Sequence, residues 1–197
     1  MRIVKKEYVF KKGEWNREDF EYVYSPRCVE FKEFKEESDC LVNAEGKALF
    51  GYEYISLITK QKYGVGTKAY TRCSFESFGA PLIVLSEDIG TDAEGRRIYG
   101  KHFEVVAYED GCNVWYIVPA PKGSEDPVIP TLIFEEHCNI EEGSPIDIWV
   151  EVEEKKLRFS VNGKVAEVEH AEIPAQFQIG FTACEGINRF FRFDVEE

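Results

Sequence analysis

Apolar and polar side chains alternate along most of the chain, with the period of two that is typical of β-strands with one buried face. In residues 72–76 and 102–107, one set of alternate positions is apolar and the other is mixed or polar. The same alternation runs through residues 146–153 and 157–162. Residues 31–38 come nearest to a helical period, and a charged edge strand or a loop explains them at least as well. The pattern predicts a protein built almost entirely of antiparallel strands.

Turn sequences separate the predicted strands. Asn162-Gly163 and Asp110-Gly111 each lie between two apolar runs, and both dipeptides favour two-residue hairpin loops. Further glycine-containing breaks give about a dozen short strands, at the spacing expected of a two-sheet sandwich. The proline-rich residues 119–130 do not suit a helix or a central strand, so we expect them to cross an end or edge of the sandwich.

Length and composition predict one domain over residues 1–197. A chain of this length can bury a large core, and it contains no internal repeat. Hydrophobic residues make up 44% and charged residues 31%, which excludes a disordered chain or one embedded in a membrane. Residues 1–12 contain no unbroken apolar stretch, and no apolar run elsewhere could span a bilayer. We therefore expect a cytoplasmic protein without a signal peptide and without membrane contact.

The formal net charge is −13, and this narrows the range of partners. Such a surface repels phosphate backbones, and the sequence has no dense cluster of lysine and arginine that would reverse the field locally. Nucleic acid is therefore not an expected partner. Neutral or weakly charged ligands are favoured over polyanions such as uronate polymers, which would need a local basic pocket.

Cysteine and carboxylate spacing gives no metal site. The six cysteines are widely scattered and are expected to be free thiols. They are Cys28, Cys40, Cys73, Cys112, Cys138 and Cys184. Four carboxylates between residues 87 and 94 are calcium-type ligands, but their spacing does not match an EF-hand loop, and a solvated turn is the favoured interpretation. No cofactor is predicted, and calcium in this loop is the alternative.

The order of segments in the C-terminal third carries a family resemblance. Two strands flank Asn162-Gly163, a short proline-containing loop follows, and then come a strand with Gly180 and an aromatic strand from Phe190 to Val195. This order resembles the closing strands of concanavalin A-like lectins and glucanases and of laminin G-like domains. The resemblance extends over residues 54–197 and is looser before them. It implies a two-sheet antiparallel β-sandwich of the jelly-roll kind.

Proteins of this fold include lectins, glycosidases, polysaccharide lyases and adhesive modules, so the resemblance alone selects none of them. Its glycosidases carry a strand motif E-x-D-x-x-E; the nearest match starts at Glu37 and Asp39 and reaches Glu45 out of phase. For the lyases, Arg72 and His102 match two of three expected strand signatures, and the third is missing. The acidic calcium ligands of legume lectins are not recognisable either.

Two predicted strands carry polar residues that suit a binding surface. Alternation places Arg72, Ser74 and Glu76 on one face of the first strand, and His102 and Glu104 on one face of the second. If these strands were neighbours on a concave sheet, the five side chains would converge. They could then bind sugar hydroxyls through charge-assisted hydrogen bonds or act in acid-base catalysis. The alternative is a solvated face with ordinary ion pairs.

Aromatic residues add to this picture. Trp115 offers a flat surface of the kind that stacks on a pyranose ring, and Asn113 beside it could orient a hydroxyl. Trp149 stands in the polar phase of its strand, although packing is the commoner role for such rings. The predicted ligand-binding residues on one concave surface are Arg72, Glu76, His102, Glu104, Trp115 and Trp149.

Three function classes follow. The leading hypothesis is a carbohydrate-recognition domain that binds an oligosaccharide or polysaccharide with little or no catalysis. The first alternative is a small glycoside hydrolase or lyase that uses His102 or Glu104 as acid or base, with Arg72 neutralising developing charge. The second alternative is a protein-interaction module or homodimer formed through an exposed sheet.

Overall fold

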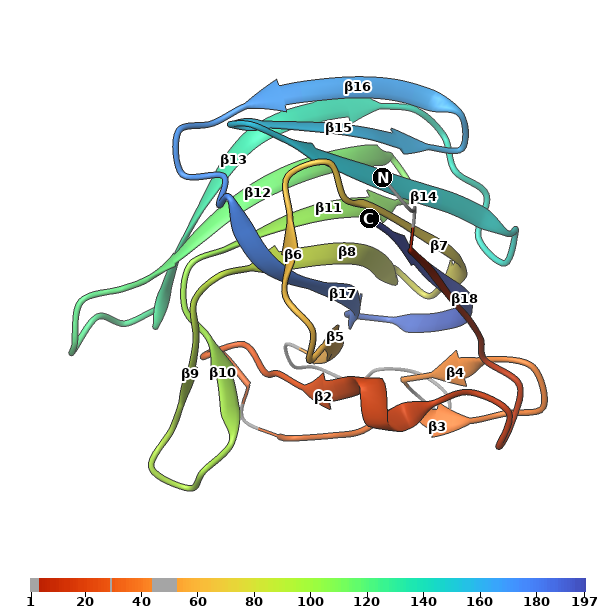
Figure 1. Ribbon diagram of the computed structural model, residues 1–197, viewed down its shortest axis with the longest axis horizontal. Coiled ribbons are helices and arrows are strands. Elements are labelled where there is room, and N and C mark those ends of the chain that lie inside the picture. Colours follow the sequence, from red (N-terminus) through yellow and green to blue (C-terminus); the bar gives the residue numbers. More distant parts are fainter. Residues whose placement is uncertain (1–3, 29, 44–52) are drawn as a thin grey trace.

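The computed structural model describes residues 4–28, 30–43 and 53–197, and nearly all of its regular structure is β-strand (Figure 1). A single 3₁₀ turn, η1 (Arg17–Asp19), is the helical element within these ranges. Its first turn is capped by the side chain of Asn16, which accepts a hydrogen bond from the Glu18 amide. The prediction of an all-β chain is confirmed.

One layer of the structure, here called the back sheet, contains eight strands. Seven of them are hydrogen-bonded in the order β16-β15-β14-β7-β18-β4-β3, and β1 pairs with β18. Their bounds are β1 (Lys5–Val9), β3 (Lys35–Glu36), β4 (Leu41–Val42), β7 (Lys68–Glu76), β14 (Ile146–Glu153), β15 (Lys156–Val161), β16 (Lys164–Glu169) and β18 (Ile187–Glu196).

The second layer, the front sheet, also contains eight strands. Seven follow the order β13-β12-β11-β8-β17-β5-β2, and β6 pairs with β17. Their bounds are β2 (Phe20–Tyr22), β5 (Tyr54–Thr59), β6 (Tyr63–Gly64), β8 (Ala80–Ser86), β11 (His102–Tyr108), β12 (Gly111–Pro119), β13 (Val128–His137) and β17 (Gln176–Cys184). A separate two-stranded ribbon is formed by β9 (Ile89–Thr91) and β10 (Arg97–Tyr99).

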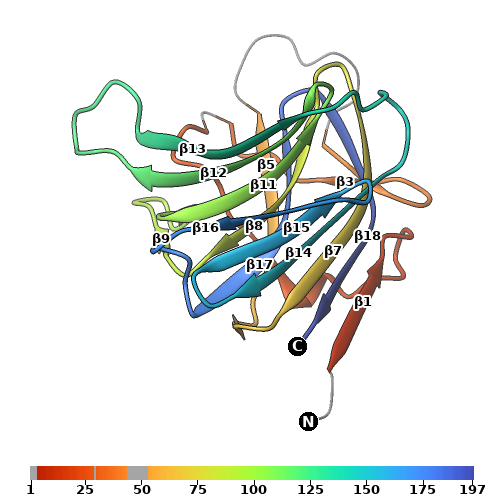
Figure 2. The ribbon, with the colours of Figure 1, turned by 90° about the horizontal axis from the view of Figure 1, so that it is seen from above.

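The two sheets pack face to face as a sandwich (Figure 2). Apolar side chains from alternate positions of the strands fill the space between them. Cys73 and Phe75 from β7, Val105 from β11, Ile148 from β14 and Phe159 from β15 are all exposed by 1% or less. Burying side chains of this size contributes about 1.5–3 kcal/mol each. The predicted two-sheet antiparallel jelly roll is therefore confirmed. Its core consists of the apolar residues that alternate with polar ones along the strands.

The predicted hairpins form, one of them with a shifted loop. Asn162 and Gly163, both with positive φ, connect β15 to β16 as a two-residue turn. In the β11–β12 hairpin the loop is Glu109-Asp110, and Gly111 is the first residue of β12. A Cβ atom on Gly111 would lie 2.0 Å from the Glu136 carbonyl oxygen, so the approach of β13 is what requires glycine there.

The two ambiguous segments lie at sheet edges. Residues 120–127 connect β12 to β13, the outermost strand of the front sheet, and Pro130 lies within that edge strand. Residues 31–38 contain β3, the outermost strand of the back sheet, so the charged edge strand is the alternative that applies.

A second, smaller apolar cluster lies on the outer face of the front sheet. It contains Val23, Tyr54, Ile58, Leu82, Val84, Tyr99 and Val106. The segment around Val23 and Tyr24 is tied to β10, because the Tyr24 amide donates to the Arg97 carbonyl and the Tyr99 amide donates to the Tyr24 carbonyl. This N-terminal segment and the β9–β10 ribbon therefore cover part of a sheet face that would otherwise meet solvent.

None of the six cysteines, all of which the structure describes, forms a disulfide, as predicted, and three of them are buried. Within the ranges that the structure describes, no helix has the length and hydrophobicity needed to cross a membrane.

Candidate functional site

A groove of about 410 Å³ hollows the outer face of the front sheet, where the N-terminal cover stops. Outward-facing residues of β8, β11 and β12 form its apolar floor: Leu82, Val106, Trp115 and Ile117. A volume of this size falls within the range of about 300–1,000 Å³ that is usual for small-molecule sites. The groove is therefore a candidate site.

A buried carboxylate lines this groove. Glu104 is only 5% exposed, and its Oε1 accepts a 2.7 Å hydrogen bond from the Tyr54 hydroxyl. The same oxygen lies 3.3 Å from Nε2 of His102. Oε2 of Glu104 has no hydrogen-bond partner among the described residues, so it is the oxygen left for a ligand.

One contact of His102 indicates its tautomer. Nδ1 is 2.8 Å from the Gly100 carbonyl oxygen, which can only accept, so we assign a proton to Nδ1. The contact between Nε2 and Glu104 Oε1 is an ion pair only when the ring also carries a proton on Nε2.

Two tight turns form one end of the groove. Ser77 and Phe78 between β7 and β8, and Glu185 between β17 and β18, are three of the five described non-glycine residues with positive φ. A left-handed backbone costs an L-residue about 1–2 kcal/mol. The turns pack closely, since a Cβ on Gly186 would lie 2.5 Å from the Ser77 carbonyl oxygen. This geometry holds the Phe78 ring at the groove edge, where Phe78 is 72% exposed.

Arg27 stands at the opposite rim and is already engaged. Its Nε donates to Asp126 Oδ1 at 2.9 Å, and its Nη2 contacts Asp126 Oδ2. Hydrogen bonding to this guanidinium lowers the pKa of Asp126. On the floor side, the buried Oδ1 of Asn113 has no hydrogen-bond partner among the described residues. The rim thus offers a guanidinium whose charge is largely balanced, and the lining offers an unused acceptor.

The remaining charges at the rim are negative. Glu109, Asp110 and Glu185 line the groove, and none of them forms an ion pair with another described residue. Glu109 and Asp110 belong to the β11–β12 loop, and Glu185 belongs to the β17–β18 turn. The groove therefore combines an apolar, partly aromatic floor with an acidic rim.

The sequence-predicted site residues divide between the two sheets. Glu104 and Trp115 line the front-sheet groove, and His102 contacts Glu104 beneath it. Arg72, Glu76 and Trp149 lie on the back sheet, because β7 pairs with β14 and β18 and not with β11. The expectation that all six share one surface is wrong. For the three residues at the groove, a ligand-binding role stays a prediction.

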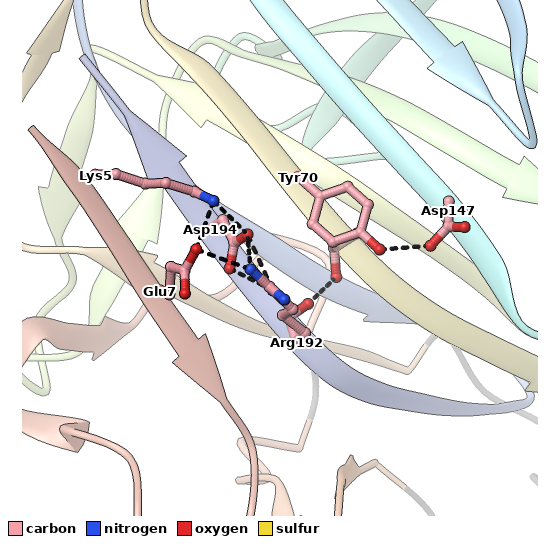
Figure 3. Close-up of polar contacts among 7 residues, drawn as sticks. Lys5, Glu7, Tyr70, Asp147, Arg192 and Asp194 are labelled. Carbon is pink, nitrogen blue, oxygen red and sulfur yellow. Dashed lines mark hydrogen bonds and ion pairs between the residues drawn. The ribbon is translucent and has the colours of Figure 1, made fainter. Parts of the chain in front are cut away.

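The back-sheet residues form ordinary surface contacts. Nε of Arg72 lies 3.9 Å from Oδ1 of Asp147. Nη1 of Arg189 donates to Oε1 of Glu76 at 2.7 Å. Trp149 lies opposite Tyr70, whose hydroxyl donates to Asp147 at 2.6 Å (Figure 3). These partners match the alternative of a solvated face with cross-strand ion pairs.

A denser polar network lies on the same back-sheet face. Arg192 donates to both carboxylate oxygens of Asp194 at 2.7–3.0 Å and reaches Glu7 on β1 at 3.0 Å (Figure 3). Lys5 contacts the same two carboxylates. Hydrogen bonding to Asp194 raises the pKa of Arg192, and hydrogen bonding to Lys5 lowers the pKa of Glu7. The network joins β1 to β18 and satisfies its own charges.

The other sequence candidates do not form sites. Asp92 accepts hydrogen bonds from the backbone amides of Glu94 and Arg96 and so closes the β9–β10 turn. No group of three or more potential metal ligands occurs among the described residues. Glu37 and Asp39 lie between β3 and β4 at the edge of the back sheet, and Glu45 lies outside the described residues.

Sequence reasoning missed Arg27 and Phe78, which line the groove, and Tyr54, whose hydroxyl donates to Glu104. Tyr54 stands in a continuously buried strand, so no alternation marked which of its residues face outward. Phe78 precedes a glycine in a predicted break between strands, and a large aromatic residue in a turn was the available signal. Arg27 belongs to an irregular segment whose position is set by contacts with β10 and Asp126, far along the chain.

No protein-family model matches the chain, and no curated protein matches it. Several solved structures do match the chain in fold. A carbohydrate-binding module from Bacillus subtilis has a TM-score of 0.59 and 8% identity, covering 87% of this chain and 91% of that one. A structure from work on endo-acting O-glycanases of human gut microbiota has a TM-score of 0.64 and 14% identity, covering 96% and 97%.

A third similar structure is an immunostimulatory antigen and pseudo-β-1,3-glucanase of Mycobacterium tuberculosis. Its TM-score is 0.53 at 12% identity, and the match covers 96% of this chain and 97% of that one. At such identities the likeness is one of fold. The chain therefore shares the jelly-roll sandwich fold of these structures.

Proposed function

We propose that this protein is a carbohydrate-recognition domain that binds a glycan in the front-sheet groove without cleaving it. The observation that carries the proposal is a groove with Trp115 on its floor and the buried Glu104 in its lining. An aromatic face stacks on the apolar side of a pyranose, and a fixed carboxylate oxygen accepts from sugar hydroxyls. The exposed ring of Phe78 adds a second apolar surface at the groove end.

The arrangement of carboxylates supports binding over cleavage. Glycosidases use a pair of carboxylates on either side of the scissile bond. The outward-facing positions of β11 are His102, Glu104, Val106 and Tyr108, so this strand supplies one carboxylate, and the other three carboxylates of the lining stand in loops at the rim. The Glu104 carboxylate is held by Tyr54 and His102, which suits a fixed acceptor.

The similar structures support the glycan assignment by fold analogy. One is described as a carbohydrate-binding module and another as a pseudo-β-1,3-glucanase. Proteins of one fold do not share function by necessity, so this support is weaker than that of the groove itself.

Trp115→Ala is the first test, with Trp149→Ala as the matched control. We expect a panel of neutral and charged oligosaccharides to contain a ligand that raises the melting temperature of the wild-type protein. Loss of the Trp115 ring should weaken that ligand's binding by about tenfold or more, since covering a large apolar side chain is worth about 1.5–3 kcal/mol. Isothermal titration calorimetry measures the change. Trp149→Ala, on the opposite sheet, should leave affinity unchanged.

Two outcomes would contradict the proposal. Equal loss from both tryptophan variants would remove the groove as the site. A panel without any ligand would favour the protein-interaction or homodimer alternative, which sedimentation at increasing protein concentration tests directly.

A hydrolase or lyase is the second candidate, and the His102–Glu104 contact favours it. An imidazole nitrogen 3.3 Å from a carboxylate oxygen beside a groove is an arrangement that acid-base catalysis can use. If this is the function, a bound oligosaccharide is cleaved by the wild-type protein, and Glu104→Gln abolishes turnover. Product analysis after prolonged incubation distinguishes it from simple binding.

A further inference from the structure

We infer that the groove selects glycans that carry free amines, such as oligosaccharides of unacetylated hexosamine. This inference rests on the proposed function and names its ligand class. Its starting point is the charge of the groove lining, which contains four carboxylates and one guanidinium. The guanidinium of Arg27 is engaged by Asp126, so it offers little attraction to an anionic sugar.

The carboxylates of the groove have few partners within the protein. Glu104 is more than nine-tenths buried, yet its Oε2 lacks a partner among the described residues. Glu109, Asp110 and Glu185 have no ion-pair partner in the described chain. A neutral sugar would form no ion pair with these three carboxylates. An ammonium group would form charge-assisted hydrogen bonds with them.

The aromatic surfaces also suit a cation. Trp115 lies on the groove floor and Phe78 stands at its end, and an ammonium group over an aromatic face gains cation–π attraction. Trp is the strongest of the natural rings in this respect. The same two rings can stack on the apolar side of a pyranose, so one sugar residue can satisfy both requirements.

A metal ion is a poorer fit than an extended ligand. Binding of a divalent ion needs several carboxylate oxygens around one point. No three potential ligands gather in this way among the described residues. Glu109 and Asp110 come from one loop and Glu185 from another, so the negative charge is distributed along the groove. Such a distribution matches positive charges repeated along a chain.

Three tetrasaccharides with one backbone test this inference. They are β-1,4-linked tetramers of glucosamine, N-acetylglucosamine and glucose, which differ only in the group at carbon 2. At about pH 5.5 and low salt, ordinary carboxylates are ionised and amines are protonated. We expect the glucosamine tetramer to bind at least about tenfold more tightly than the glucose tetramer by calorimetry. Raising the salt to about 0.5 M should remove most of that preference.

A charge-neutralised variant assigns the preference to the rim. Glu109→Gln, Asp110→Asn and Glu185→Gln together should reduce the preference to about threefold or less. The control carries Glu18→Gln, Glu154→Gln and Glu169→Gln, which remove the same net charge at exposed positions away from the groove. It should keep the full preference.

The outcomes separate the two proposals. Equal binding of all three tetramers overturns the amine preference and leaves the glycan function intact. Absence of binding to any oligosaccharide, with the protein folded, overturns both. A tetralysine peptide that binds as tightly as the glucosamine tetramer and displaces it would overturn the glycan assignment, because the groove would then recognise charge without the sugar ring.

Discussion

At the scale of single residues, the buried Glu104 makes a stability prediction. Tyr54→Phe removes the hydroxyl that donates to Glu104 Oε1 and leaves a buried carboxylate with one contact fewer. We expect it to lower the free energy of unfolding by about 1–3 kcal/mol. Urea denaturation measures this. Tyr108→Phe is the control: its hydroxyl donates to Glu135 at an exposed position, so its loss should cost no more than about 0.5 kcal/mol.

Equal effects from the two tyrosine variants would show that Glu104 does not depend on Tyr54. The comparison isolates burial, since both variants delete one hydroxyl that donates to a glutamate.

Alternation predicts which face of a strand a side chain occupies, and this succeeded for His102 and Glu104. It does not predict which sheet that strand joins. Arg72 and Glu76 were grouped with His102 because both strands show the same pattern. The grouping failed because β7 pairs with β14 and β18, more than 70 positions further along the chain. Those pairings depend on long-range contacts that a local period does not encode.

At the scale of secondary-structure elements, Gly180 in β17 makes the next prediction. A Cβ there would lie 2.0 Å from the Leu57 carbonyl oxygen on β5 and 2.6 Å from Ile58 Cα. Gly180→Ala should therefore separate β17 from β5 and cost about 2 kcal/mol or more. A Cβ on residue 163 would have no atom within 4 Å. Gly163→Ala should therefore lower the free energy of unfolding only through its positive φ, by about 1–2 kcal/mol. Urea denaturation ranks the two variants, and a smaller loss for Gly180→Ala would contradict the close approach.

Elements with local signals were predicted well, and elements without them were not. The β15–β16 hairpin follows from an Asn-Gly dipeptide between alternating runs, all within one stretch of sequence. The N-terminal segment shows no such period. Its β1 pairs with the last strand, its β2 pairs with β5, and Tyr24 joins β10. The groove boundary depends on this segment, so the sequence predicted the sandwich without predicting the site.

At the scale of the whole molecule, the sequence provided no reason to prefer the outer face of either sheet as a binding surface. The structure distinguishes the two faces, because additional segments cover part of the front sheet. The back-sheet face carries paired charges, such as Arg192 with Asp194. The front-sheet face is covered at one side by the N-terminal segment and the β9–β10 ribbon, which leaves a hollow beside them. The proposed binding groove thus lies where a partial third layer ends.

Cysteine thiols with raised pKa values should make the folded protein less stable at alkaline pH. Burial raises the pKa of Cys28 and Cys112 to about 11 and that of Cys40 to about 12. In the unfolded chain these thiols ionise near pH 8.5, so the folded state holds more protons above that pH. The free energy of unfolding should therefore be constant up to about pH 8 and fall as the pH rises toward 11.

The negative net charge acts in the same direction, because every ionised thiol adds to a repulsion that starts at −13. Urea midpoints at about pH 7.5, 9 and 10 under reducing conditions measure the slope. Cys28→Ala combined with Cys112→Ala removes two of the titrating groups and should give a shallower decline than the wild-type protein. A steady midpoint up to about pH 10, or an unchanged slope in this variant, would show that buried thiols do not set the alkaline limit.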